Sequence, residues 1–397
     1  MNNKPSDHAD LSLIPPVLKT GPLPDYERLD YGMSIGIERT PKGRLWACWV
    51  GGGDNDKAFF VLATSDDAGE NWSRPCLVID PHDAAQPFAC RTIVGTLWTD
   101  PLGRLWLFFD LSLTFFDGRA GTWFTRCDQP DAEDPTWTHP IRIWHGCVLN
   151  KPVVRSNGEW LLTISLWDRG KIAEPFSDAF HELDEWRMVN VFASSDEGQT
   201  WTRRGGARIP KPEFDEAHVI ERLDGSLWMT ARSTTGIWEC ESHDGGKTWS
   251  EARLSAIANV NSRHFLRRLK SGRLLLVKHG NKIDERPSDV PYALRSQLTA
   301  FLSDDDGVTW KGGLALDQRA GISYPDGTQA PDGTIFLSYD YNRDTNGEIL
   351  MARFTEEDVL AGRCVSPRSR LRMLISQPDI LAVAARLARE NKIPALT

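Results

Sequence analysis

Arginine, lysine and histidine side chains recur at matching places around six short apolar runs of this sequence. They stand shortly before or after these runs: Arg91, His145, Lys151, His218, Arg263, His264, His279 and Arg343. A histidine can move a proton near neutral pH, and an arginine can grip a carboxylate through paired hydrogen bonds. A single histidine is more often structural, but matching places in a radially repeated unit converge on one axis. The pattern therefore predicts a ring of polar side chains around one ligand site.

A loop of three glycines, 51–53, follows the first apolar run and leads to two acids, Asp54 and Asp56. Consecutive glycines let the backbone approach a ligand closely. The loop is not of the phosphate-binding kind, because no Gly-Lys-Ser/Thr sequence and no following helix accompany it. We interpret it as a ligand-facing loop that carries two acidic side chains.

The apolar runs are launched by one turn that the sequence repeats six times. In each copy a glycine stands just before the run, as in LDGSLWMTA, which ends at Ala231. These pivot glycines are about 47 to 67 residues apart: Gly43, Gly103, Gly158, Gly225, Gly272 and Gly333. Glycine supplies the positive φ that a tight turn of this kind needs.

A second motif, which we call the lock, interleaves with the launching turns. It places Ser, Asp, Gly and Trp at fixed offsets, so that the Ser and Asp can bond local N–H groups while the Trp fills the adjacent core. The intact copies are Ser65 to Trp72, Ser194 to Trp201, Ser242 to Trp249 and Ser303 to Trp310. The segment Asp131 to Trp137 keeps only the Thr-Trp end of the motif.

Several strands per repeat, at a period of tens of residues, are typical of a β-propeller. Six launching turns predict an all-β, six-bladed β-propeller that spans residues 30–355. Residues 1–29 are expected to form an N-terminal arm, and residues 356–397 a helical extension that packs on the propeller. The apolar face of the last helix would dock on the propeller or on a second subunit, which leaves a homo-oligomer open.

The four intact locks resemble the Asp-boxes, or BNR repeats, of the sialidase (neuraminidase) superfamily, whose catalytic domain is a six-bladed propeller. The resemblance covers roughly Asp30 to Phe354. Because the boxes lie away from the active site of that superfamily, they indicate the fold, and the activity depends on other positions.

The resemblance implies a tyrosine nucleophile assisted by a glutamate. Tyr324 and Glu216 occupy the corresponding places of this sequence. A tyrosine hydroxyl has a pKa of about 10, so it needs a neighbouring carboxylate as base to attack at neutral pH. The acid/base of the superfamily is an aspartate on the loop after the first launching strand, here Asp54 or Asp56, which the sequence does not separate.

The superfamily holds the substrate carboxylate with three arginines, of which two have counterparts. Arg232 follows the fourth launching strand, and Arg295 precedes the last lock. The first arginine, which opens the first blade, is replaced by Met33. The remaining ring members have no counterpart and are expected to contact the substrate: Arg91, His145, Lys151, His218, Arg263, His279 and Arg343.

The resemblance implies an exo-glycoside hydrolase that releases a terminal acidic sugar, either sialic acid or another anionic sugar. Two alternatives stay open. A polysaccharide lyase or histidine-dependent glycosidase acting on uronate-containing glycans would neutralise the C5 carboxylate with arginines and move the proton with His145 or Tyr324. A non-catalytic carbohydrate-binding propeller would only retain the glycan.

Composition narrows the remaining possibilities. The net charge of −9 and the lack of a basic stripe argue against a nucleic-acid partner. The seven cysteines show no metal-ligand spacing, so we expect buried thiols and no metal or cofactor. No signal peptide and no apolar run of ~18 residues is present, which predicts a cytoplasmic protein without a membrane partner. A leader missing from the sequence would instead indicate a periplasmic or secreted protein.

Overall fold

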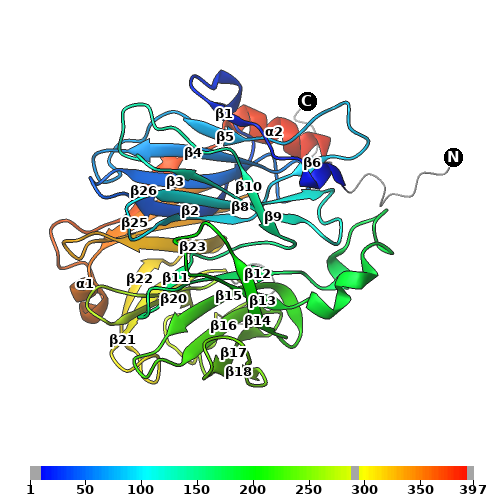
Figure 1. Cartoon of the computed structure of the whole chain (residues 1–397). Helices are drawn as coiled ribbons and strands as arrows, with labels where there is room; N and C mark the ends of the chain where they lie inside the picture. The colour runs from blue at the N-terminus through cyan, green and yellow to red at the C-terminus, as the bar shows by residue number, and fades with distance from the viewer. Residues whose placement is uncertain (1–9, 288–294, 391–397) are drawn as a thin grey trace.

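Six antiparallel sheets follow one another along the chain and are arranged around a common axis, which we call the channel, so the fold is a six-bladed β-propeller (Figure 1). The computed structural model describes residues 10–287 and 295–390. The first sheet, in blue, lies beside the sixth, in orange, so the ring closes between the two ends of the chain. The predicted fold class is confirmed.

Each blade is built from consecutive strands. The first contains β1 (Leu18–Thr20), β2 (Met33–Arg39), β3 (Leu45–Gly51), β4 (Phe59–Ser65) and β5 (Leu77–Ile79). The second contains β6 (Cys90–Arg91), β7 (Gly95–Thr99), β8 (Leu105–Leu113), β9 (Gly121–Cys127) and β10 (Ile141–Trp144). The third contains β11 (Val153–Val154), β12 (Trp160–Ser165), β13 (Val189–Ser194) and β14 (Thr202–Ala207).

The other three blades have four strands each. The fourth contains β15 (Pro212–Glu221), β16 (Leu227–Ser233), β17 (Gly236–Ser242) and β18 (Arg253–Leu254). The fifth contains β19 (Phe265–Arg268), β20 (Leu274–His279), β21 (Leu298–Ser303) and β22 (Lys311–Asp317). The sixth contains β23 (Ile322–Gln329), β24 (Ile335–Tyr341), β25 (Glu348–Phe354) and β26 (Arg370–Ser376). Short 3₁₀ turns lie between strands: η2 (Pro24–Tyr26), η3 (Arg169–Lys171) and η4 (His181–Trp186).

The six launching turns join the inner part of each blade to its long central strand. In every turn the N–H of the pivot glycine donates to the carbonyl oxygen three residues earlier, as Gly43 does to Thr40 at 3.0 Å. All six glycines have positive φ, from +82° at Gly225 to +112° at Gly43. A side chain would strain this backbone, which explains the glycine in each copy of the turn.

The locks share one hydrogen-bonding pattern. In the third blade, Ser194 Oγ donates to Asp196 Oδ1 (2.8 Å) and accepts from Gly198 N (2.9 Å), while Thr200 N donates to Asp196 Oδ1 (2.9 Å). Each lock serine pairs across its sheet with the first residue of a launched strand. Locks and launching turns therefore lie at one end of the propeller, and the launched strands end at the other.

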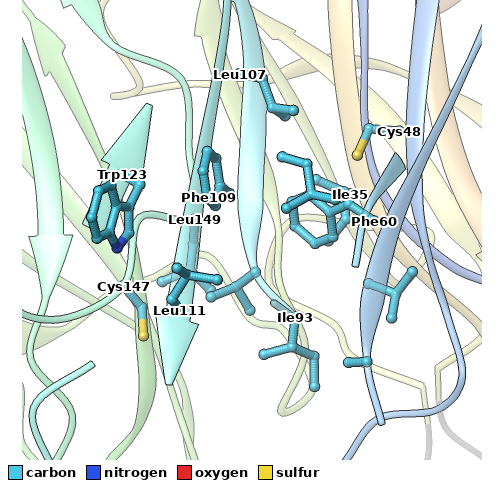
Figure 2. Packing of buried hydrophobic residues seen from close by; sticks show 14 of the residues in the cluster. Ile35, Cys48, Phe60, Ile93, Leu107, Phe109, Leu111, Trp123, Cys147 and Leu149 are labelled. Carbon is cyan, nitrogen blue, oxygen red and sulfur yellow. The ribbon is translucent and has the colours of Figure 1, made fainter. Parts of the chain in front are cut away.

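Apolar side chains fill the space between neighbouring blades. Figure 2 shows Ile35 and Phe60 of the first blade in one buried cluster with Ile93, Leu107 and Phe109 of the second. Every residue of β3 and of β8 is buried, because both faces of these strands are covered. This burial explains why the launched strands are continuous apolar runs.

Two buried carboxylates of the sixth blade close the ring by binding the backbone of β2. Asp340 Oδ2 accepts from Ser34 N (3.1 Å), and Asp326 Oδ2 accepts from Ile37 N (3.1 Å). The pairing of β2 with β3 shifts register between Ser34 and Gly36. A Cβ on Gly36 would lie 2.4 Å from Asp326 Oδ2, so only glycine allows this contact.

Both chain ends add strands, so the propeller sheets extend beyond the predicted limits of residues 30 and 355. β1 pairs with β5, and β26 pairs with β25. β26 is an outer strand with little buried surface, and its mixed charged and apolar sequence did not indicate a strand. Helix α1 (Glu356–Ala361) packs on β21 and β22, and α2 (Ile380–Arg389) lies beside the first blade, where Arg386 Nε donates to Asp30 O (Figure 1). Among the described residues, no helix combines the length and apolarity needed to cross a bilayer.

All seven cysteines are free thiols. Four of them are buried, namely Cys48, Cys127, Cys147 and Cys240, and Cys364 is exposed. The buried thiols contribute to the apolar core, where a small hydrophobic side chain fits.

Gly36→Ala is expected to lower the free energy of unfolding by about 3–5 kcal/mol, because the new methyl group collides with Asp326 and displaces a buried hydrogen bond. The matched control is Gly170→Ala on an exposed turn, where the added Cβ meets only the Asp168 side chain, at 3.2 Å. Its expected effect is within about 0.5 kcal/mol. Urea unfolding of both variants measures the difference, and equal stabilities would contradict the closure described above.

Candidate active site

A hollow of roughly 490 Å³ lies at the end of the channel where the launched strands finish. Its wall combines residues of the first, second, fourth, fifth and sixth blades, and includes Asp54, Arg232, Arg295, Tyr324 and Arg343. A second hollow, of roughly 540 Å³, lies at the opposite end among the launching turns. The expected tyrosine and arginines line the first hollow, which we call the pocket.

Tyr324, Glu216 and Arg232 form a buried hydrogen-bonded triad in the pocket. Tyr324 Oη donates to Glu216 Oε1 at 2.6 Å. Arg232 Nη1 lies 3.1 Å from both carboxylate oxygens of Glu216 and 3.3 Å from Tyr324 Oη. The carboxylate is therefore within reach of the phenolic proton, and the guanidinium balances its charge.

Two β-bulges on inner strands aim these side chains. The pairing of β23 with β24 shifts register between Ser323 and Asp326, and Tyr324 has φ +57°. The pairing of β15 with β16 shifts register before Ala217, and Asp215 has φ +49°. Left-handed backbone at residues other than glycine costs about 1–3 kcal/mol and is concentrated at functional sites.

Burial and charge set the ionisation of the triad. Burial would raise the pKa of Glu216, but the charge of Arg232 and the Tyr324 hydroxyl hold this pKa below its ordinary value. Burial, together with the Glu216 carboxylate, raises the pKa of Tyr324. At neutral pH the resting pair is therefore a neutral phenol bonded to a carboxylate, the arrangement that a base-assisted nucleophile requires.

Asn261 orients the two arginines that the sequence singled out. Its side-chain oxygen accepts from Arg232 Nε at 2.7 Å, and its backbone oxygen accepts from Arg295 Nη2 at 3.0 Å. Both arginines line the pocket, and only 3% and 8% of their respective surfaces are exposed. The cations are thus held in place without closing the hollow.

The glycine loop brings one of its two acids to the pocket. Asp54 lines the pocket and pairs with Arg343 at 3.3 Å. Asp56 is exposed and is not part of the pocket wall; its backbone oxygen lies 3.0 Å from His82 Nε2. The structure therefore separates the two candidates that the sequence left equivalent.

Three of the expected substrate contacts lie in the channel below the pocket instead of in its wall. Lys151 Nζ is 3.1 Å from Glu38 and 3.0 Å from Asp326. Arg263 bonds Asn150 and Ile35 O and pairs with Asp326. His218 is buried, which lowers its pKa well below the ordinary value, and bonds a backbone oxygen. Their polar groups already have partners inside the protein.

Three further expected contacts also lie outside the pocket wall. Arg91 is fully buried, pairs with Asp110 and donates to Phe115 O. His279 lies between Ser296 O and Ser262 Oγ, and burial lowers its pKa to about 3. His145 follows the outer strand β10 and bonds Arg142. The comparison between blades predicted His145 near the axis, but the residue directly follows an outer strand and therefore lies away from the pocket.

Several pocket residues escaped the sequence analysis. Asn261 precedes β19, and Phe115 and Phe214 bring aromatic rings to the wall, 6.2 Å apart. The Arg232 guanidinium lies 5.4 Å from the Phe214 ring. Phe214 lies two residues before Glu216, and Asn261 lies two residues before Arg263. This closeness in sequence to predicted site residues was the one signal that could have indicated them. Within residues 10–287 and 295–390, His, Cys, Asp and Glu side chains form no group of three or more that could hold a metal ion.

A sequence profile of the BNR repeat-like domain family matches residues 43–337. The chain belongs to this BNR repeat-like family.

Its propeller is 28% identical over 165 residues to the anhydrosialidase of Macrobdella decora, over 37% of this chain and only 21% of that protein. The Hadza microbial sialidase Hz136 has a similar structure, with a TM-score of 0.62 and 17% identity, over 84% of this chain and 67% of that one. The intramolecular trans-sialidase from Ruminococcus gnavus gives a TM-score of 0.62 and 16% identity, over 86% and 97%. The BNR repeat-like propeller therefore has the sialidase fold.

Asp215 predicts a pH dependence of stability. Burial, followed by the charges of Asp168 and Glu216, raises the pKa of Asp215 to about 7, and its Oδ1 has no hydrogen-bond partner. The unfolded value is about 3.9, so the folded protein favours the neutral acid, and stability falls as the pH rises from about 4 to about 7. Asp215→Asn should remove this decline, which is on the order of 1.4 kcal/mol per pKa unit.

Urea unfolding of the wild type and of Asp215→Asn at pH 4.5 and at pH 8 measures this effect. The two proteins should differ more at pH 8 than at pH 4.5. Parallel losses of stability would show that Asp215 ionises as readily in the folded state as in the unfolded chain.

Proposed function

We propose that this BNR repeat-like protein is a glycoside hydrolase that releases a terminal anionic sugar, with Tyr324 as nucleophile. The observation that carries the proposal is the 2.6 Å hydrogen bond from Tyr324 Oη to Glu216, made in a pocket that also holds arginines. A neutral nucleophile suits an anionic sugar, because a carboxylate nucleophile would repel it. The sialidase fold supports the same reaction class.

In the first step, Tyr324 Oη bonds the anomeric carbon while Glu216 takes the phenolic proton. The glycosidic C–O bond breaks, and Asp54, which has first taken up a proton from solvent, gives that proton to the leaving oxygen. In the second step, Asp54 takes a proton from a water molecule whose oxygen attacks the anomeric carbon. The tyrosyl C–O bond breaks, and Glu216 returns its proton to Tyr324. The sum is hydrolysis, and both acids end in their starting states.

Arg232 and Arg295 have two tasks in this scheme. They hold the anionic group of the sugar by charge-assisted hydrogen bonds. Arg232 also keeps Glu216 ionised in a buried place, so that the base is ready at neutral pH. Guanidinium groups already fixed by Asn261 need little reorganisation as charge moves during the reaction.

The lyase alternative has less support. His145, one of its two proton-moving candidates, bonds Arg142 beside the outer strand β10. Tyr324, the other candidate, is directed to Glu216. A lyase would still be recognised by an unsaturated uronate product that absorbs in the ultraviolet, whereas a binding protein would release no sugar at all.

The first test is a panel of aryl glycosides of sialic acid and of uronic acids, with mass-spectrometric analysis of the products. Tyr324→Phe should lower kcat on the accepted glycoside by on the order of 10³-fold or more, because no covalent intermediate can form. Tyr26→Phe is the matched control, since its hydroxyl bonds Asp80 in the first blade, away from the pocket. Undiminished turnover by Tyr324→Phe would disprove the proposed nucleophile.

A second test separates the acids of the glycine loop. Asp54→Asn should lower kcat by roughly 10²–10⁴-fold on a glycoside with a poorly leaving alcohol, and by much less on one with an activated phenol. Asp56→Asn should leave both rates nearly unchanged, because its side chain is not in the pocket wall. The reverse result would assign the acid role to Asp56.

A further inference from the structure

Arg343 brings a guanidinium to the pocket next to Met33, the buried residue that stands where the resemblance implies an arginine. Its Nη1 lies 3.0 Å from Met33 Sδ, although the two residues belong to opposite ends of the chain. Met33 begins β2, and Arg343 follows β24 in the adjacent sixth blade. The thioether of Met33 cannot hold an anion, whereas the guanidinium beside it can.

The inner side of Arg343 is fixed. Its Nη2 donates to Ser323 Oγ at 2.7 Å and to Asp340 Oδ2 at 3.2 Å. Asp340 is fully buried and also accepts from Ser34 N and Ser323 Oγ. The guanidinium lies 4.6 Å from the centre of the Tyr324 ring. Arg343 is thus a preorganised cation next to the proposed nucleophile.

The outer side of Arg343 has a partner that can be exchanged. Nη1 pairs with Asp54, whose side chain is 43% exposed, whereas the side chain of Asp340 is fully buried. Asp54 follows Gly52 and Gly53, which have φ +82° and +130°, so its loop has conformations that few residues adopt. Only the acid of this pair is exposed, since Arg343 is 9% exposed, but a bound anion that takes the place of Asp54 leaves the guanidinium paired, so the exchange costs little.

The neighbouring cation in the channel does not have this property. Arg263 lies 6.0 Å from the Tyr324 ring, but it is 1% exposed and bonds Asn150, Ile35 O and Asp326. Arg263 is not part of the pocket wall. Among the described residues, the arginines that line the pocket are Arg232, Arg286, Arg295 and Arg343, and of these Arg286 is exposed.

We propose, on the basis of the function proposed above, that Arg343 holds the anionic group of the sugar together with Arg232 and Arg295. It takes the role of the arginine that the resemblance implies at position 33, where this chain has Met33. The anionic group of the sugar displaces Asp54 from Nη1 of Arg343. The displaced carboxylate takes up a proton from solvent and is then free to face the leaving oxygen. The Arg343 guanidinium therefore couples binding of the anion to the release of Asp54 as the acid. A neutral sugar would leave Asp54 paired with Arg343.

The test compares the inhibitor DANA, which carries one carboxylate, with its methyl ester, by calorimetry. Arg343→Met combined with Asp340→Asn removes the cation without leaving a buried charge unpaired. This double variant should bind the acid on the order of tenfold to a hundredfold more weakly and should bind the ester as the wild type does. Arg343→Lys keeps a charge beside Asp340 and should show a smaller loss of affinity for the acid, again without a loss for the ester. This variant tests the proposal if the double variant does not fold.

A restoring substitution and a control sharpen the comparison. Met33→Arg, added to the double variant, should recover the preference for the acid, because the new guanidinium enters the same corner from β2. Arg319→Met removes an arginine that lies 3.8 Å from the Tyr341 ring outside the pocket wall, and should leave the preference unchanged. Equal losses for acid and ester, or none, in the Arg343 variants would overturn the assignment.

The exchange of Asp54 has its own readout. Asp54→Asn removes the competing anion, so DANA should bind about two- to fivefold more tightly in the wild-type background. The same substitution should have no effect in the Arg343→Met/Asp340→Asn background. Weaker binding of DANA by Asp54→Asn, or an equal effect in both backgrounds, would overturn the exchange.

Failure of the proposed function gives a different pattern. A wild-type protein that binds neither DANA nor its ester and cleaves no glycoside of the panel would overturn both proposals together. A wild-type protein that cleaves an aryl sialoside, with acid and ester binding equally affected in the Arg343 variants, would leave the hydrolase standing and remove the role of Arg343.

Discussion

The structure depends on the two carboxylates that join the first blade to the last. Asp326 and Asp340 are buried at the seam, and each accepts a backbone N–H of β2. A propeller has no covalent link across this seam, so the ends of the chain must be held by contacts of this kind. The same carboxylates hold cations of the centre, since Asp326 pairs with Lys151 and Arg263, and Asp340 with Arg343. Closure of the ring and construction of the site are therefore one electrostatic arrangement.

Charge is sorted along the channel. Deep in the channel, Lys151 and Arg263 lie against acids, so the cations there are compensated. Toward the pocket, Arg232 and Arg343 share their charge with Glu216, Asp340 and Asp54. Buried ion pairs often contribute little net stability but fix geometry, and here they hold guanidinium groups against a hollow. A chain with a net charge of −9 can in this way present a local cluster of cations.

Sequence reasoning predicted the fold because the launching turns and locks are local. A pivot glycine such as Gly43 and a serine such as Ser194 act on residues within a few positions, so their pattern is visible in one chain. Tyr324 and Glu216 were predicted from the resemblance to the sialidase superfamily, and the Tyr324 hydroxyl lies 2.6 Å from the Glu216 carboxylate. The pairing of Arg343 with Met33 was not predictable, because it depends on how the last blade meets the first.

The misjudged positions have equally physical causes. His145 was aligned with inner strands, but it directly follows the outer strand β10, before the chain reaches the inner strand β11 of the third blade. β26 was taken for part of a helical tail, since an outer strand buries too little surface to need an apolar pattern. The bulges at Tyr324 and Asp215 leave no mark in composition, although they determine where the side chains point.

The separation of the locks from the pocket has a consequence for diversification. Locks and launching turns occupy one rim, whereas the loops after the launched strands form the other, so the pocket-facing loops carry little of the folding information. Such loops can be grafted or lengthened while the opposite rim still specifies six blades. A scaffold of this kind can acquire a new ligand preference through changes confined to a few exposed segments.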